Sequence, residues 1–171
     1  MMRFYILIVL FFSSIGPSFS QNTTVFDIAR KGTLAEIEAL YKQNPELINT
    51  VDDRKSSPLL LACYRGNTEV ALFLAKKVTD VNYNSGMGTA LMAAVMSGKI
   101  EIVKSLIDVK ADLNQTDSQG KTALIYAAFF NKNDIYETYL WAKNSSIKNQ
   151  TENDWREANW LFLEVKEVYN T

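Results

Sequence analysis

The strongest constraint on the fold of this chain is an internal repeat with a period of about 33 residues. Ser57, Thr89 and Thr122 lie 32 and 33 positions apart, and each opens a similar apolar segment. The aligned segments are residues 57–82, 89–114 and 122–143, and a weaker copy covers residues 26–49. A period of this length indicates a stack of small units, in which each unit packs mainly against its neighbours.

Each unit predicts two short antiparallel helices. The first helix begins at Ser57, Thr89 or Thr122, whose hydroxyl can accept a hydrogen bond from a first-turn amide. Pro58 follows Ser57 at the position where a missing N–H costs least. Small residues on the inner side of this helix let neighbouring units approach closely, and these are Ala62, Ala94 and Ala127. We expect the helix to end at a left-handed residue, supplied by Gly32, Gly66, Gly98 and Asn131.

These units resemble ankyrin repeats. The resemblance is carried by Gly120-Lys121-Thr122-Ala123-Leu124, by AVMSG at residues 94–98 and by ADLN at residues 111–114. It implies an all-α ankyrin-repeat solenoid of about four helix-turn-helix repeats joined by short hairpin loops. The repeats are expected over residues 21–143, in units of about 24–55, 56–87, 88–120 and 121–143.

The chain also departs from the family pattern. The family histidine is replaced in each unit, so apolar packing must substitute for its hydrogen bond to the threonine, and the replacements are Leu60, Met92 and Ile125. Val78 and Lys110 stand where the family has a glycine, and a β-branched valine is poorly suited to positive φ. We therefore expect a different helix end at Val78. The family position whose side chain ties the inter-repeat loop together is occupied by Asn49, Asn82 and Asn114.

The first 20 residues predict a signal peptide. A short positive start ending at Arg3 precedes nine apolar residues, 4–12, and small residues follow at Ser18 and Ser20. Cleavage is expected near Ser20–Gln21, which predicts a secreted or periplasmic protein without membrane insertion after processing. The alternative is a membrane anchor, but a spanning helix needs about 20 apolar residues and Gly16-Pro17 interrupts the run too early.

The repeat pattern stops after Lys143. Residues 144–153 are polar and predict a linker, and residues 154–171 predict an amphipathic helix whose stripe includes Trp155 and Val165. Because a repeat stack exposes an apolar end, we expect this helix to cap it. The alternative is a partner-binding helix with Trp160 as its outer anchor.

The residue types restrict the chemistry. The chain has no histidine, which removes histidine-based nucleophile activation and most zinc sites, and Cys63 stands in a helical apolar pattern that predicts a buried filler. Gly86-Met87-Gly88 lacks the flanking residues of a phosphate loop, and Asp52-Asp53 falls where a solvated turn is expected. A formal net charge of −1 with scattered basic residues gives no reason to expect nucleic-acid binding. We expect no catalytic residue, metal or cofactor.

A binding surface is predicted where exposed positions of the first helices align across the stack. Tyr, Phe, Met and Arg are the residue types enriched in interface cores, and the resemblance implies that the hairpin tips and the concave face bind protein. The predicted partner-binding residues are Tyr64, Arg65, Met96, Ser97, Tyr126, Phe129 and Phe130. We expect Tyr64 and Met96 to be exposed. Phe129 and Phe130 belong either to this surface or to packing beneath the Trp155 helix.

The sequence thus favours a monomeric, non-enzymatic and exported module that binds another protein. Two alternatives stay open: an accessory or immunity-type inhibitor of an exported enzyme, and a self-assembling structural component. A catalyst that uses carboxylates alone is a third, which no motif supports.

Overall fold

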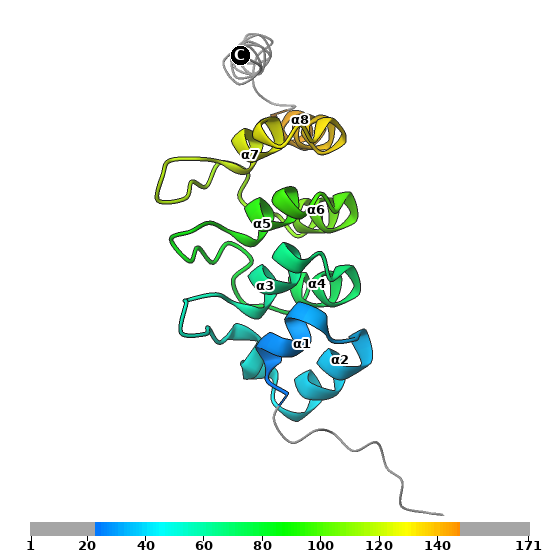
Figure 1. The fold of residues 1–171 in the computed structure, drawn as a ribbon. Helices are drawn as coiled ribbons and strands as arrows, with labels where there is room; N and C mark the ends of the chain where they lie inside the picture. The colour runs from blue at the N-terminus through cyan, green and yellow to red at the C-terminus, as the bar shows by residue number, and fades with distance from the viewer. Residues whose placement is uncertain (1–22, 148–171) are drawn as a thin grey trace, which may run out of the picture.

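The computed structural model describes residues 23–147, which form a stack of helix pairs (Figure 1). Within these residues the regular elements are all helical, as the repeat pattern predicts. In chain order they are α1 (Val25–Lys31), α2 (Leu34–Gln43), the 3-10 helix η1 (Pro45–Asn49), α3 (Pro58–Arg65), α4 (Thr68–Ala75), α5 (Ala90–Ser97), α6 (Ile100–Asp108), α7 (Ala123–Phe129) and α8 (Asn133–Ile147). The all-α solenoid expected from the sequence is confirmed.

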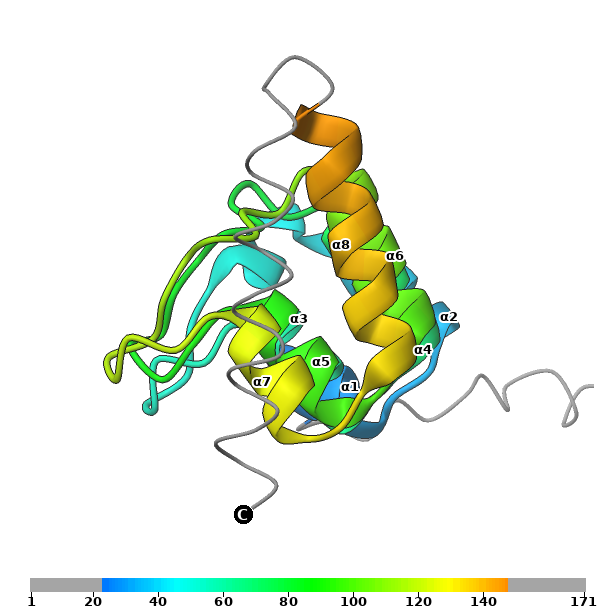
Figure 2. The same ribbon diagram turned by 90° about the horizontal axis from the view of Figure 1, so that it is seen from above.

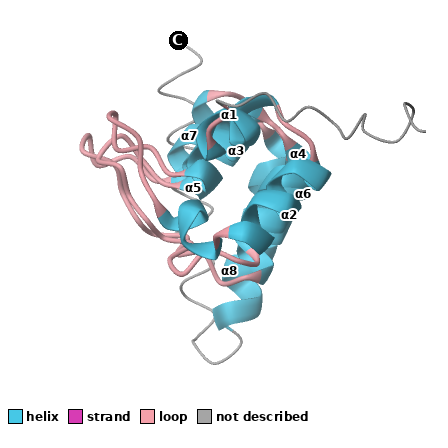
Figure 3. Ribbon diagram, turned by 90° about the horizontal axis from the view of Figure 1, so that it is seen from below, coloured by secondary structure: helices cyan, strands magenta, loops and turns pink. Residues whose placement is uncertain are grey.

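The helices form two columns. In the view from above, α1, α3, α5 and α7 lie over one another as an inner column, and α2, α4, α6 and α8 form an outer column (Figure 2). The loops between repeats project together to one side of the inner column, as the view from below also shows (Figure 3). This arrangement creates a concave side bounded by the inner helices and the loops.

Hydroxyl caps start the inner helices where the sequence predicts them. Ser57 Oγ accepts from the Leu60 amide at 3.2 Å, and Thr89 and Thr122 accept from the equivalent amides at 3.4 Å. The first unit uses a different device: Thr24 and Thr33 each form a capping box with an acidic residue three positions on. The position at which each of these helices begins is therefore set by hydrogen bonds within its own first turn.

The helix ends confirm most of the expected turns and correct one. Gly66, Gly98 and Asn131 have φ values of 66°, 71° and 52°, in the left-handed region. Gly32 does not, because its φ is −80° and its backbone is extended. A Cβ at Gly32 would lie 2.7 Å from the Ile28 Cα, so glycine provides space there and not a left-handed turn.

Asn67 explains why the first inner helix can end in extended backbone. Its side-chain amide donates toward the carbonyl oxygens of Ile28, Ala29 and Gly32, at 3.4, 3.3 and 2.9 Å. These contacts satisfy carbonyl groups that a left-handed turn would otherwise serve. The extended conformation of Gly32 therefore depends on Asn67, which lies 35 positions away in the sequence.

The backbone at Val78, which follows α4 (Thr68–Ala75), takes another conformation than the left-handed one, as expected. Lys110 adopts a φ of 66°, while Val78 is not among the residues with positive φ. Asn49 and Asn82 tie adjacent repeats: Asn49 Oδ1 accepts from the Thr79 amide at 3.0 Å, and Asn82 Oδ1 accepts from the Asp112 amide at 2.7 Å. These bonds repeat with the period of the stack.

The core runs along the interface between the two columns. Ala62, Ala94 and Ala127 are at most 1% exposed, which permits the close approach of α3 to α5 and of α5 to α7. Cys63 is fully buried, as predicted. Of the residues that replace the family histidine, Met92 is buried and Leu60 and Ile125 are half-buried, so apolar groups do occupy these positions.

The C-terminal boundary differs from the expected one. Helix α8 continues to Ile147, so the linker predicted from Asn144 begins too early. The predicted signal peptide, the remainder of the linker and the predicted capping helix at 154–171 lie outside the described residues. Among residues 23–147, no helix is long and apolar enough to span a bilayer.

Candidate functional site

A groove of 390 Å³ lies on the concave side, between the inner helices α3 and α5 and the loops that precede them. Its lining comes from α1, α3, α5 and the first two inter-repeat loops, and consists of Arg30, Asp52, Arg54, Ser56, Leu60, Leu61, Tyr64, Arg65, Ser85, Met87, Gly88, Thr89, Met92, Ala93 and Met96. We call this the concave groove. It combines apolar side chains with arginines, the composition expected of an interface core.

The apolar part of the concave groove is accessible to solvent. Tyr64 is 53% exposed, Met96 is 36% exposed and Met87 is 85% exposed, whereas Met92 below them is buried. The predicted exposure of Tyr64 and Met96 is therefore confirmed. Several exposed aromatic and methionine side chains share this groove, and removing their apolar area from water by covering it would be favourable.

The charged part of the groove begins with an ion pair. Arg30 Nη2 lies 3.0 Å from Asp52 Oδ2 and links α1 to the first loop. Asp52 Oδ1 also accepts from the amides of Ser56 and Arg54, at 2.8 and 3.0 Å. Burial opposes ionisation of Asp52, but these amides and Arg30 outweigh it and hold its pKa below the usual value. The solvated turn predicted at Asp52 is thus a turn, but a half-buried and ion-paired one.

Arg54 and Arg65 supply the remaining positive charge. Both side chains are exposed, and the guanidinium of Arg65 lies 6.0 Å from the centre of the Tyr64 ring. This distance is within the range of a cation–π contact, which favours one placement of the Arg65 side chain beside the ring. The groove therefore offers guanidinium groups next to its apolar surface.

Hydrogen bonds between successive inter-repeat loops hold the wall of the concave groove that these loops form. Tyr83 Oη donates to the Lys55 carbonyl at 2.9 Å, joining the first loop to the second. Asn84 Nδ2 donates to the Thr116 carbonyl at 2.8 Å, and the Ser118 amide donates to the Gly86 carbonyl at 3.0 Å. Because each loop is tied to the next, the wall is formed before a ligand arrives.

The predicted aromatic residues of the last repeat form a separate cluster, outside the lining of the concave groove. Phe129 and Phe130 are 55% and 40% exposed, with ring centres 5.1 Å apart and nearly perpendicular planes. Tyr126 stacks on Phe130 at 6.3 Å, and its hydroxyl donates to Asp117 Oδ2 at 2.6 Å. That hydrogen bond raises the pKa of Tyr126. Tyr126 therefore tethers the third loop to α7.

The structure divides the predicted site residues into three groups. Tyr64, Arg65 and Met96 line the concave groove, and Tyr126 belongs with Phe129 and Phe130 to the aromatic cluster. Ser97 does not line the groove, and its hydroxyl donates to the Ala94 carbonyl at 2.9 Å within its own helix. The side chain of Ser97 therefore contacts its own helix, α5.

Sequence reasoning missed Met87, Arg54 and Met92. Met87 stands between Gly86 and Gly88, both at positive φ, and that glycine-flanked segment was weighed only as a phosphate loop. The sequence does contain a signal for Met87, because an apolar residue at the tip of a polar turn is expected to be exposed on the surface. Arg54 counts in the sequence only as one of the scattered basic residues, which give no reason to expect nucleic-acid binding.

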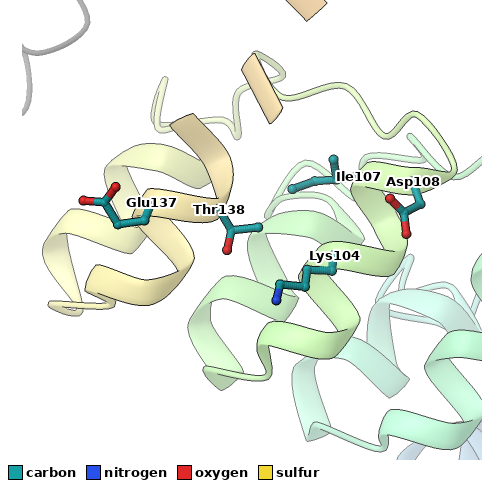
Figure 4. A pocket seen from close by; sticks show the side chains of 5 residues that line it. All are labelled: Lys104, Ile107, Asp108, Glu137 and Thr138. Atoms are coloured by element: carbon teal, nitrogen blue, oxygen red, sulfur yellow. The ribbon is translucent and has the colours of Figure 1, made fainter. Parts of the chain in front are cut away.

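A second groove, of 470 Å³, lies on the outer column between α6 and α8. It is lined by Lys104, Ile107, Asp108, Glu137 and Thr138, and we call it the outer groove (Figure 4). Lys104 and Ile107 come from α6, while Glu137 and Thr138 come from the neighbouring helix α8. Among the described residues that line it, only Ile107 is apolar.

Within the described residues the one cysteine is buried, and the carboxylates form no metal-binding group. Burial raises the pKa of the Cys63 thiol far above its usual value, which keeps it protonated and unreactive. Among residues 23–147, no group of three acidic or cysteine side chains could hold a metal ion. The geometry of the described residues supports binding through surface contacts.

Comparison with known proteins agrees with this geometry. A family model described as ankyrin repeats (3 copies) matches residues 25–117 and 79–151. The chain is 33% identical over 124 residues to the rice "Probable E3 ubiquitin-protein ligase XBOS32", covering 69% of this chain and 25% of that protein. It is 29% identical over 112 residues to the rat "Ankyrin repeat and SAM domain-containing protein 6", covering 64% of this chain and 13% of the relative.

A further relative is the human "Ankyrin repeat and KH domain-containing protein 1", 39% identical over 75 residues, or 44% of this chain and 3% of that protein. The chain therefore belongs to the ankyrin repeat family, whose repeats are protein–protein interaction modules. It spans a quarter or less of these relatives, and the ligase activity in one name is that of the relative.

Proposed function

We propose that this chain is a non-enzymatic module that binds a partner protein through the concave groove. The observation that carries the proposal is the joint exposure of Tyr64, Met87 and Met96 in a groove walled by hydrogen-bonded loops. Exposed apolar side chains cost solvation free energy that a partner recovers by covering them. The loops are already ordered, so little entropy is lost on binding.

Site-specific photocrosslinking tests this proposal. A photoreactive amino acid is placed at Tyr64 or Met96 in the full chain, and a matched variant carries it at Lys104 in the outer groove. We expect the concave positions to yield a discrete crosslinked protein that the Lys104 position does not. Equal crosslinking at both faces, or none at Tyr64 and Met96, would overturn the proposal.

The same experiment separates the alternative functions. Capture of a single exported enzyme, with loss of that enzyme's activity on stoichiometric binding, would support an immunity-type inhibitor. Capture of a second copy of this chain, together with a concentration-dependent mass in sedimentation, would support a self-assembling component. A crosslink to a different protein by a monomeric chain supports the leading proposal.

We also propose that the protein is exported and processed near Ser20–Gln21. The support is the order of a positive start, an apolar run of nine and small residues at 18 and 20. Intact-mass measurement on protein recovered from the medium or cell envelope should give a chain that starts at Gln21. Recovery of only full-length chain from the cytosol would contradict this.

A further inference from the structure

The concave groove carries a net positive charge, in contrast to the chain as a whole. Arg30, Arg54 and Arg65 line it with a single carboxylate, Asp52, whereas the chain has a formal net charge of −1. Asp52 is paired with Arg30 at 3.0 Å. Within the described residues, neither Arg54 nor Arg65 takes part in a salt bridge. Two exposed guanidinium groups are thus left to meet a ligand.

The apolar side chains of the groove lie among these arginines. Tyr64 contributes an aromatic ring with the Arg65 guanidinium over its face, and Met87 and Met96 contribute flexible thioethers on the loop side and the helix side. Methionine adapts to the shape of different apolar groups, and arginine binds carboxylates with two parallel hydrogen bonds. The groove can therefore accept an apolar anchor and a carboxylate at neighbouring points.

From this combination we propose that the partner presents an acidic segment with an aliphatic or aromatic anchor. The inference rests on the proposed function and specifies its ligand. The anchor packs against Tyr64, Met87 and Met96, and flanking Asp or Glu side chains pair with Arg54 and Arg65. Charge complementarity selects this segment over basic ones, because a like charge beside either guanidinium is repelled.

The outer groove provides a contrast within the same molecule. Its volume is 470 Å³, and the described residues that line it include one lysine, Lys104, against the carboxylates of Asp108 and Glu137. An acidic ligand gains no net attraction there. A charge reversal at Lys104 is therefore a matched control, since it changes the chain's charge by the same amount as a reversal at Arg54 or Arg65.

Peptide selection against the full chain tests the ligand chemistry without knowledge of the partner. A displayed library of random 12-residue peptides is selected on the immobilised protein, and the affinity of selected synthetic peptides is measured by fluorescence anisotropy. We expect enrichment of sequences with at least two Asp or Glu near a Leu, Ile, Phe or Trp. Binding should weaken as salt increases, because Arg54 and Arg65 are exposed.

Variants then locate the bound peptide. R54E and R65E should each weaken binding about 5- to 10-fold, since each replaces an attraction by a repulsion, while K104E should leave it within about 2-fold. M87S should weaken binding without altering its salt dependence. Circular dichroism spectra that match the parent chain establish that the variants are folded.

Three outcomes would overturn the inference. Selection of neutral or basic peptides would refute the charge argument, and unchanged affinity in both R54E and R65E would refute the location. Competition by a synthetic peptide of residues 154–169 would assign the groove to the chain's own C-terminal segment. In any of these cases, crosslinking at Tyr64 would still report separately on the proposed function.

Discussion

The concave and outer grooves differ in chemistry far more than in size. The concave groove of 390 Å³ exposes Tyr64, Met87 and Met96 beside arginines, whereas the described residues that line the outer groove of 470 Å³ include one apolar residue, Ile107, among polar ones. Exposed apolar area with a one-sided charge favours the concave groove, and it is this chemistry that distinguishes a binding surface from a gap between helices.

The largest expected effect tests whether the exposed aromatic residues of the inner helices belong to the surface or to the core. Leu106→Ala removes a fully buried side chain of α6 and should lower the free energy of unfolding by about 2–5 kcal/mol. Tyr64→Ser and Phe129→Ser, at 53% and 55% exposure, should each cost about 1 kcal/mol or less. Chemical denaturation measures both. If Tyr64→Ser lowers the free energy of unfolding by several kcal/mol, Tyr64 is a core residue and is not part of an exposed groove surface.

The ion pair at the N-terminal end of the concave groove should have the next largest effect. Asp52→Asn removes the pairing with Arg30 and weakens two backbone hydrogen bonds, which should destabilise the chain by about 1–2 kcal/mol. Lys104→Ala in the outer groove is the matched control. If Asp52→Asn and Lys104→Ala have the same melting temperature, the Arg30–Asp52 ion pair does not contribute measurably to the stability of the chain.

The pH dependence of stability should follow from the same carboxylate. The folded pKa of Asp52 is lowered, as is that of Asp117, where burial is outweighed by hydrogen bonds from Tyr126 and the amides of Lys121 and Gln119. Each carboxylate therefore stabilises the fold above its unfolded pKa of about 3.9, and this contribution is lost as pH falls through the lowered folded values. Thermal melts from pH 7 to pH 2.5 should show the loss, and Asp52→Asn should reduce it.

A smaller effect compares two helix ends that use the same backbone conformation. Gly98→Ala should destabilise by about 1 kcal/mol, because φ is 71° and the added Cβ would lie 2.9 Å from Lys132 Nζ. Asn131→Gly, at φ 52°, should be neutral or stabilising by a few tenths of a kcal/mol. The reverse order would show that the side chain of Asn131 makes a contact that outweighs its backbone strain.

The smallest effect is expected in the outer groove. Lys104→Ala and Thr138→Ala should each change the free energy of unfolding by about 0.5 kcal/mol or less, since surface substitutions away from special features usually do. Neither should alter crosslinking at Tyr64. A strong loss of partner capture by Lys104→Ala would place the binding surface on the outer column and reverse the comparison.

The repeat pattern determined the helices and their order because those depend on local chemistry. Hydroxyl caps at Ser57, Thr89 and Thr122 and left-handed ends at Gly66 and Gly98 follow from the residues themselves, and all are present. Gly32 was wrongly expected to be left-handed because its helix end is completed by Asn67 from the next repeat. A contact between residues 35 positions apart leaves no trace in local sequence.

The lining of the concave groove was recovered only in part, for the same physical reason. Tyr64, Arg65 and Met96 could be aligned because equivalent helix positions recur with the repeat period. Met87 and Arg54 reach the groove from loops, whose course is decided by bonds such as Tyr83 Oη to the Lys55 carbonyl. The sequence alone determined a stack of helix pairs with aromatic residues on its inner helices. Only tertiary structure placed the loops over those helices, separated Phe129 and Phe130 from the groove and left two arginines free of salt bridges within the described residues.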